Sequence, residues 1–168
     1  MVFGEVAVTD KKTHKSKLLR SFDPEEMESR SAAEILTWAI KNYHPRLVLS
    51  ASFGAPEGMA LLDMMHRIEP TSRVFVLDTG RLHAATFDLI DRVRDRYGKP
   101  IEVVFPHAED VQQMVRSKGM NHFYESLENR KLCCRIRKVE PMRRYLRDFD
   151  AYVTGLRREQ SPTRSDTT

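Results

Sequence analysis

The chain has 168 residues, of which 40% are hydrophobic and 31% charged, a composition typical of one globular domain. No apolar run approaches the roughly 18 residues that a membrane-spanning helix needs, and the N-terminus lacks the pattern of a secretory signal. We therefore expect a cytoplasmic protein with no membrane segment. The two cysteines are adjacent, which argues against a disulfide framework and for thiolate or metal chemistry in a reducing compartment.

The formal net charge of +4 is unevenly distributed along the chain. From Arg130 to Arg164 there are eleven Lys and Arg residues against four Asp and Glu, and the remainder is slightly acidic. Such a basic stretch raises the local concentration of an anionic ligand, which can be a nucleotide, sulfate, an anionic cluster or nucleic acid. A solvated basic helix face is the alternative interpretation.

Residues 1–30 are mixed in character and are expected to form an N-terminal arm, with a short strand over 2–8, while residues 31–168 form the core. The spacing of apolar and turn residues predicts helices at 31–43, where Ser31 and Glu34 have capping-box spacing, and at 56–69, 82–97, 109–118 and 132–147, the last kinked or broken at Pro141. It also predicts strands at 46–52, 73–77, 101–105 and 151–154. This alternation predicts an α/β fold in three layers, a parallel sheet flanked by helices. Ligands of such sheets bind beyond the carboxyl ends of the strands.

The first candidate loop is Ser-Ala-Ser-Phe-Gly-Ala at residues 50–55, between a predicted strand and a predicted helix. Its small residues let backbone N–H groups approach a phosphate or sulfate, and the helix N-terminus adds a favourable potential. A tight turn shaped only by sterics has a similar composition. The candidate ligand-binding residues here are Ser50, Ser52, Phe53 and Gly54.

Two further loops follow predicted strands and carry candidate binding residues. In the first, Asp78 can accept hydrogen bonds or cap the next helix, Gly80 relaxes the turn, and Arg81 can reach an anion; its candidates are Leu77, Asp78, Thr79, Gly80 and Arg81. The second contains arginines, whose planar guanidinium binds phosphate or sulfate oxygens in pairs. Its candidates are Gly155, Leu156, Arg157, Arg158 and Arg164, and a disordered basic tail is the alternative interpretation.

The adjacent cysteines, Cys133 and Cys134, lie among Lys and Arg residues, which favour the thiolate form needed for metal ligation. Adjacent cysteines can also serve as ordinary small buried residues. On an ideal helix Lys138 would share a face with Cys134, four residues before it. We take the two cysteines as candidate metal ligands and Lys138 as a candidate ligand-binding residue.

In their order along the chain these motifs resemble those of the adenylyl-sulfate and phosphoadenylyl-sulfate reductases of sulfate assimilation, over about residues 31–164. The resemblance implies the adenine-nucleotide alpha-hydrolase-like (PP-loop) fold and a thioredoxin-dependent reduction of adenylyl sulfate to sulfite and AMP, as part of cysteine biosynthesis. The cysteine pair implies adenylyl sulfate as the substrate and, in the intact family protein, a four-iron four-sulfur cluster. Neither a flavin nor a nicotinamide is implied. Lys138 is implied to lie between cluster and substrate, and the loop at 77–81 to accommodate the adenosine.

In the mechanism of this family a C-terminal cysteine attacks the sulfate sulfur, AMP leaves, and thioredoxin liberates sulfite from the resulting enzyme thiosulfonate. The sequence has no cysteine after Cys134, so we expect a shortened reductase that binds substrate but lacks the nucleophile and is inactive by itself. The alternatives are a phosphoadenylyl-sulfate reductase, an ATP-dependent PP-loop enzyme and a non-catalytic nucleotide-binding module. Nucleic acid is not favoured, because few aromatic residues accompany the arginines, and a homo-oligomer is left open.

Overall fold

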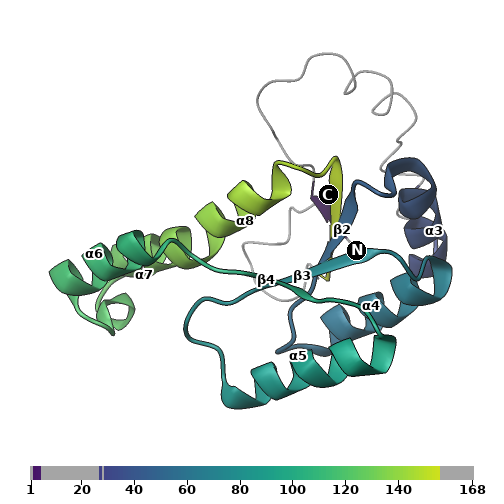
Figure 1. Cartoon of the computed structure of the whole chain (residues 1–168). Helices are drawn as coiled ribbons and strands as arrows, with labels where there is room; N and C mark the ends of the chain where they lie inside the picture. Colours follow the sequence, from purple (N-terminus) through teal and green to yellow (C-terminus); the bar gives the residue numbers. More distant parts are fainter. Residues whose placement is uncertain (1, 5–26, 28, 156–168) are drawn as a thin grey trace. The chain divides into compact units, whose positions relative to one another are not determined.

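The computed structural model describes residues 2–4, 27 and 29–155 of the chain (Figure 1). Its elements are β1 (Val2–Gly4), α3 (Ala32–Tyr43), β2 (Leu47–Ser50), α4 (Pro56–Ile68), β3 (Arg73–Leu77), α5 (Ala84–Tyr97), β4 (Glu102–Val104), α6 (Ala108–Lys118), η2 (His122–Tyr124), α7 (Leu127–Cys134), η3 (Arg135–Val139), α8 (Glu140–Leu146) and β5 (Ala151–Thr154). The element η2 is a short 3-10 helix and η3 is a π-helical turn. None of the described helices is long and apolar enough to cross a membrane.

The strands form one sheet in the order β1-β5-β2-β3-β4. Strand β2 runs parallel to β5, with Ser50 opposite Thr154, and β3 runs parallel to β4, with Leu77 opposite Val104. Strand β1 pairs antiparallel with β5. The predicted α/β fold, a parallel sheet with helices, is therefore confirmed, and β1 adds an antiparallel edge. Because parallel strands end at the same edge of a sheet, this register also fixes which of the predicted loops are neighbours.

The chain folds as two compact units: residues 1–74 with 147–168 (unit 1), and residues 75–146 (unit 2). In unit 1, helices α3 and α4 contact each other and strand β2. The core of this unit consists of aliphatic side chains from these helices and strands, among them Leu36, Ala39, Val48, Leu49, Leu62, Met65 and Val153. All of these lie at the periodic apolar positions from which the elements were predicted, so burial explains both the helical and the strand patterns.

The core of unit 2 forms around the end of β3 and the helices that follow it. Its buried residues include Phe75, Val76, Ile90, Val93, Met114 and Leu146. The Phe75 side chain is 0% exposed, and its ring lies 4.6 Å from the ring of Tyr145 in α8. The loop between α6 and α7 is anchored by His122, which is 1% exposed and whose Nδ1 lies 2.8 Å from the Gly119 carbonyl oxygen.

The last long helix begins earlier than predicted and is not broken at its proline. It starts at Leu127, because the Ser126 side chain accepts a hydrogen bond from the Asn129 N–H and caps it. Before Pro141 the helix widens into the π-turn η3, in which the Glu140 N–H donates to the Arg135 carbonyl. A proline in an ordinary helix loses one hydrogen bond and clashes with a carbonyl of the preceding turn, and a wider turn at that point relieves the clash.

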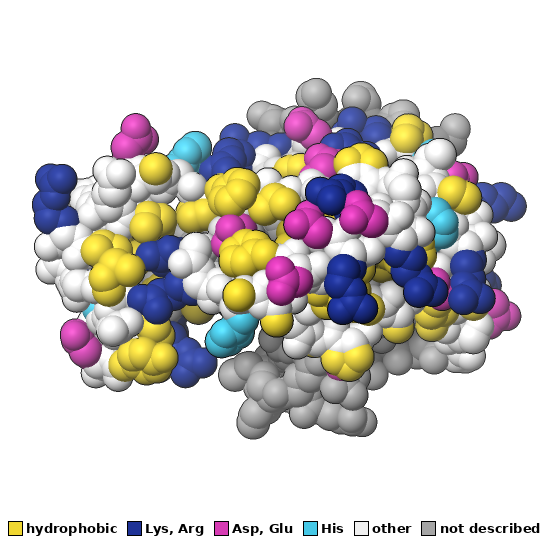
Figure 2. Space-filling model, turned by 60° about the horizontal axis from the view of Figure 1, so that its bottom comes forward, with side chains coloured by type: hydrophobic (Ala, Val, Ile, Leu, Met, Phe, Trp, Pro, Cys, Tyr) yellow, Lys and Arg dark blue, Asp and Glu magenta, His cyan; other side chains and the backbone are white. Residues whose placement is uncertain are grey.

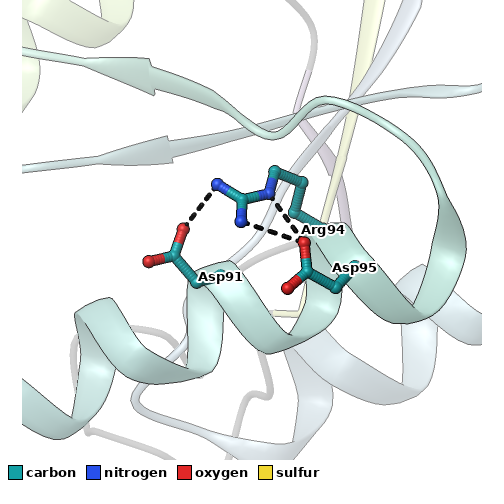
Figure 3. Close-up of polar contacts among 3 residues, drawn as sticks. All are labelled: Asp91, Arg94 and Asp95. Atoms are coloured by element: carbon teal, nitrogen blue, oxygen red, sulfur yellow. Dashed lines mark hydrogen bonds and ion pairs between the residues drawn. The ribbon is translucent and has the colours of Figure 1, made fainter.

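The solvent-facing side of α5 carries a small ion-pair network (Figure 3). The Arg94 guanidinium lies 2.8 Å from Asp91 Oδ1 and 2.9 Å from Asp95 Oδ1. The hydrogen bond to Asp95 is the main reason that the pKa of Arg94 is raised above its ordinary value. Since all three side chains are exposed, the network adds little to the stability of the fold. It marks the outer face of a helix that packs through Ile90 and Val93.

Charged side chains of both signs are interspersed on the face drawn in Figure 2, with apolar side chains among them. Among the described residues the exposed large apolar side chains belong almost entirely to unit 2; they are Phe87, Val103, Phe105, Met120, Tyr124, Leu127 and Val139, with Ile68 in unit 1. Tyr124 and Leu127 are 80% and 60% exposed. In the segment between α6 and α7, Met120 and Tyr124 are thus exposed.

The N-terminus of α3 provides a pH-dependent test of the predicted capping box. We expect Glu34→Gln to lower the melting temperature at neutral pH and to change it little in acid. Hydrogen bonds from the Ser31 hydroxyl and backbone N–H hold the pKa of Glu34 below its ordinary value of 4.5. A lowered pKa stabilises the fold above the unfolded pKa, and this stabilisation is lost as the pH falls through the folded pKa.

Melting temperatures of the wild type and of Glu34→Gln, measured from about pH 3 to about pH 7, test this expectation. In a Ser31→Ala background the pH-dependent difference should be smaller, because this change removes the hydroxyl donor to the Glu34 carboxylate and keeps the backbone N–H donor. A difference between wild type and Glu34→Gln that stays constant over this range would contradict the expectation.

Candidate functional site

The loop that follows β2 in unit 1 is tightly packed against the start of α4. Phe53 is buried at 5% exposure, whereas Ser52 and Gly54 are exposed. Gly58, in the first turn of α4, is buried, and a Cβ atom there would stand 2.5 Å from the Ser52 carbonyl oxygen and 2.9 Å from the Ser52 nitrogen. Only glycine permits this approach of helix and loop backbones. The loop of residues 50–55 is thus held in a close turn by a glycine outside it.

The N-terminus of α4 has the features of an anion site. Its N-cap residue, Ala55, has an extended backbone and makes no side-chain capping hydrogen bond, and Pro56 occupies the first turn. The backbone N–H groups of this turn therefore receive no capping side chain from Ala55, and they lie at the positive end of a helix of 13 residues. These N–H groups are the physical basis of the predicted role of the loop in binding phosphate or sulfate.

The end of β5 lies next to this loop within unit 1. Thr154 pairs with Ser50, and the following residue, Gly155, packs on α4. A Cβ atom on Gly155 would stand 2.8 Å from the Glu57 Cβ and 3.4 Å from Leu61 Cδ1. Two of the predicted motifs, which are about a hundred residues apart in the sequence, therefore meet at one edge of the sheet, as expected for neighbouring parallel strands.

In unit 2 the loop after β3 makes a compact turn. The Asp78 N–H donates to the Val104 carbonyl at 3.0 Å, and its Oδ1 accepts the Gly80 N–H at 2.7 Å. Gly80 has φ +69°, in the left-handed region that favours glycine. Asp78 and Thr79 are buried at 9% and 8% exposure. In this structure Asp78 thus folds the turn itself, by the side-chain-to-backbone bond typical of aspartate in loops.

Arg81, predicted to reach an anion, is engaged with the segment before α7. Its guanidinium donates to the Met120 carbonyl and, at 3.0 Å, to Asn121 Oδ1. It also lies 4.6 Å from the centre of the Phe123 ring, at the distance of a cation–π contact. These contacts orient Arg81 along the surface of unit 2 and tie the β3 loop to the chain that leads into α7.

The cysteine pair ends helix α7, also in unit 2. Cys133 and Cys134 are free and half-buried, and Lys138 is exposed. The π-turn begins at Arg135, between the cysteines and Lys138, so the ideal-helix spacing that predicted a shared face for Cys134 and Lys138 is interrupted. Among the described residues no group of three or more His, Cys, Asp or Glu side chains is arranged to hold a metal ion.

The predicted binding residues are distributed over both units. Ser50, Ser52, Phe53, Gly54 and Gly155 belong to unit 1, and Leu77, Asp78, Thr79, Gly80, Arg81, Cys133, Cys134 and Lys138 to unit 2. Leu156, Arg157, Arg158 and Arg164 lie outside the described residues. Sequence reasoning missed Gly58 and Arg137. The available signals were a glycine inside a predicted helix and an arginine that precedes Pro141 by four residues in the same predicted helix.

Comparison with known proteins assigns the class. Residues 46–168 match the phosphoadenosine phosphosulfate reductase domain, and the chain therefore belongs to this family. The fold agrees, since the structure superimposes on the crystal structure of phosphoadenylyl-sulfate reductase from Candida auris, a phosphate complex, with a TM-score of 0.62 at 22% identity, covering 89% of this chain and 70% of that one. The PP-loop-like fold expected from the motifs is confirmed.

Individual relatives are more similar in sequence. The adenosine 5'-phosphosulfate reductase of Burkholderia cepacia is 43% identical over 143 residues, which cover 85% of this chain and 57% of the relative. The chloroplastic 5'-adenylylsulfate reductase 3 of Arabidopsis thaliana is 40% identical over 167 residues, covering 96% of this chain and 36% of the relative. The chain thus spans only about a third to a little over half of these relatives.

Proposed function

We propose that this chain is the substrate-binding part of an adenylyl-sulfate reductase, which reduces adenylyl sulfate to sulfite and AMP in sulfate assimilation. The observation that carries the proposal is the edge of unit 1 where the loop after β2 and Gly155 meet beside the N-terminus of α4, whose N-cap residue, Ala55, makes no side-chain capping hydrogen bond. Backbone N–H groups at such an edge suit a phosphate or sulfate group. The relatives named adenylyl-sulfate reductases support the choice of substrate.

The reaction is a two-electron reduction in which the electrons come from a dithiol that ends as a disulfide. Thioredoxin is the electron donor in this proposal. The only cysteines in the sequence are Cys133 and Cys134, which are the proposed cluster ligands. The nucleophilic thiol is therefore not among these 168 residues. The part proposed for this chain is to bind the nucleotide and to stabilise its negative charges electrostatically. A reducing compartment, the cytoplasm, belongs to the same proposal because both described cysteines are free.

A four-iron four-sulfur cluster takes four cysteine ligands, and this chain has two. The residues present therefore fit half of the cluster's ligand set, and the chain by itself does not hold a complete site. We propose that Cys133 and Cys134 supply two of the ligands when the remaining two come from another polypeptide segment. No step assigned to this chain depends on the cluster.

Calorimetric titration of the chain with AMP and with adenylyl sulfate tests the proposal. We expect both ligands to bind, and adenosine 3',5'-bisphosphate to bind no better than AMP. Preference for the bisphosphate would favour phosphoadenylyl sulfate as the substrate, and pyrophosphate release from ATP would favour an ATP-dependent enzyme. Absence of binding at millimolar ligand, with the fold intact by circular dichroism, contradicts the proposal.

Arg157→Ala is expected to weaken binding by about 1–3 kcal/mol, as for a charge-assisted contact.

A further inference from the structure

Arg137 is a charged residue in the interior of unit 2. It lies in the π-turn η3, three residues after Cys134, and is 6% exposed. Its Nη1 donates to the Thr79 carbonyl oxygen at 2.6 Å, and its Nε is buried with no hydrogen-bond partner among the described residues. Arginine is almost never fully buried unless paired, because burial removes its hydration. An arginine held in this way, on one backbone carbonyl, calls for an explanation.

The loop after β3 is shaped around this guanidinium. A Cβ atom on Gly80 would stand 3.1 Å from Arg137 Nη1, and Gly80 already has a positive φ. The Gly80 N–H is held by Asp78, while the Thr79 carbonyl, on the other side of the same peptide unit, is held by Arg137. The Thr79–Gly80 peptide is therefore fixed at both of its polar ends, and its orientation depends on Arg137.

The position of Arg137 follows from the turn in which it lies. The Glu140 N–H donates to the Arg135 carbonyl, five residues back, and this wide turn immediately precedes Pro141. A π-turn shifts the side chains that follow it relative to the preceding helix, and such turns are frequent at functional sites. The cysteine pair is at the end of α7, directly before the turn. One short segment thus carries both the two thiols and the side chain that holds the β3 loop.

We propose that Arg137 is a positioning residue that sets the conformation of the β3 loop and couples it to Cys133 and Cys134. Arg81 provides a second link, since it binds Asn121 on the segment that leads into α7. Ligand bound at the β3 loop then alters the reactivity of the two thiols through the Thr79–Arg137 hydrogen bond. This inference rests on the proposed function for the ligand, but the coupling itself is a property of the free protein.

Four variants test the coupling: Arg137→Met removes the donor, Arg137→Lys keeps one donor, Gly80→Ala crowds the guanidinium, and Arg135→Met is the matched control. Arg135 lies in the same turn but is exposed. The readouts are the backbone amide resonances of Thr79 and Gly80, the alkylation rate of each cysteine by mass spectrometry with and without AMP, and AMP affinity by calorimetry. Circular dichroism checks the fold.

In the free protein, Arg137→Met is expected to shift the Thr79 and Gly80 amide resonances, and Gly80→Ala is expected to shift that of Thr79. Both variants are expected to change the alkylation rates. Arg135→Met removes a charge next to Cys134 but no hydrogen bond to Thr79, so it should leave the Thr79 and Gly80 resonances unchanged. AMP is expected to change alkylation in the wild type and to lose this effect in Arg137→Met. The AMP affinity of this variant is expected to fall by roughly tenfold or more, because Arg137 no longer fixes the orientation of the Thr79–Gly80 peptide. Arg137→Lys should recover part of the AMP affinity and part of the effect of AMP on alkylation, because an ammonium group can still donate to the Thr79 carbonyl.

The outcomes separate this inference from the proposed function. If the wild type does not bind AMP, the proposed function fails, and the resonances and alkylation rates of the free variants still decide the role of Arg137. If Arg137→Met binds AMP as the wild type does, and AMP still changes its alkylation, the inference is overturned. Should Arg137→Met fail to fold, Arg137→Lys and Gly80→Ala decide it by the same readouts.

Discussion

Replacing Gly58 with alanine is expected to destabilise unit 1 and to abolish most of the affinity of the chain for AMP. The new Cβ atom would stand 2.5 Å from the Ser52 carbonyl oxygen, a separation that real Cβ atoms essentially never show. The atoms it meets are backbone, so neither can rotate away, and α4 and the loop must move apart. Overpacking of this kind costs about 1–3 kcal/mol in unfolding free energy. The displaced N–H groups are those proposed to bind the phosphate or sulfate.

Gly54 provides the matched control for stability. It lies in the same loop, a Cβ atom there would meet nothing within 4 Å, and its φ is not in the left-handed region. Gly54→Ala should therefore change the unfolding free energy by no more than about 0.5 kcal/mol, the range of ordinary surface substitutions. Urea denaturation gives both values, and calorimetry gives AMP affinity below the unfolding transition. Equal urea midpoints for Gly58→Ala and Gly54→Ala would mean that the close approach of Gly58 to Ser52 is not required.

Replacing Phe75 with alanine is expected to cause the largest loss of stability, about 3–5 kcal/mol, the usual cost of deleting a buried aromatic side chain. Phe75 is fully buried in β3, and its ring packs against Tyr145, 4.6 Å away. An aromatic pair of this kind adds about 0.5–1.5 kcal/mol beyond the buried area. Since whole domains have only about 5–15 kcal/mol of stability, one such cavity removes much of it.

Phe87→Ala is the control for this substitution, because Phe87 is in the same unit but 43% exposed. It should lose far less stability, while Phe75→Leu, which keeps most of the buried volume, should lie between the two. The midpoints of urea denaturation give the stability of all three variants relative to the wild type when the m-value, the slope of the unfolding free energy against urea concentration, is unchanged. The expectation is wrong if Phe87→Ala and Phe75→Ala have the same midpoint. Because Asp78 follows Phe75 by three residues, the same cavity is expected to loosen the turn at Thr79 and Gly80.

Most of the fold was predictable because its signals are local. The apolar spacing of α3, α4 and α5, the capping box at Ser31 and the runs of buried residues in β2 and β3 all depend on neighbours in the sequence. The parallel direction of the strands then followed from their alternation with helices. The helix that contains Cys133 was predicted with a late start, since its capping residue, Ser126, stands before a turn with few apolar residues.

From the sequence we could predict the family, the alternation of strands and helices, and the location of the loop after β2 and of Gly155 beyond the carboxyl ends of their strands, because each depends on local motifs or on the direction of parallel strands. The strand order that places β5 beside β2, and the contacts of Gly58 with Ser52 and of Arg137 with Thr79, required the three-dimensional structure. Both contacts join segments whose distance and orientation no local pattern encodes. A glycine in a helix and an arginine in a basic run become informative only when the backbone that each approaches is known.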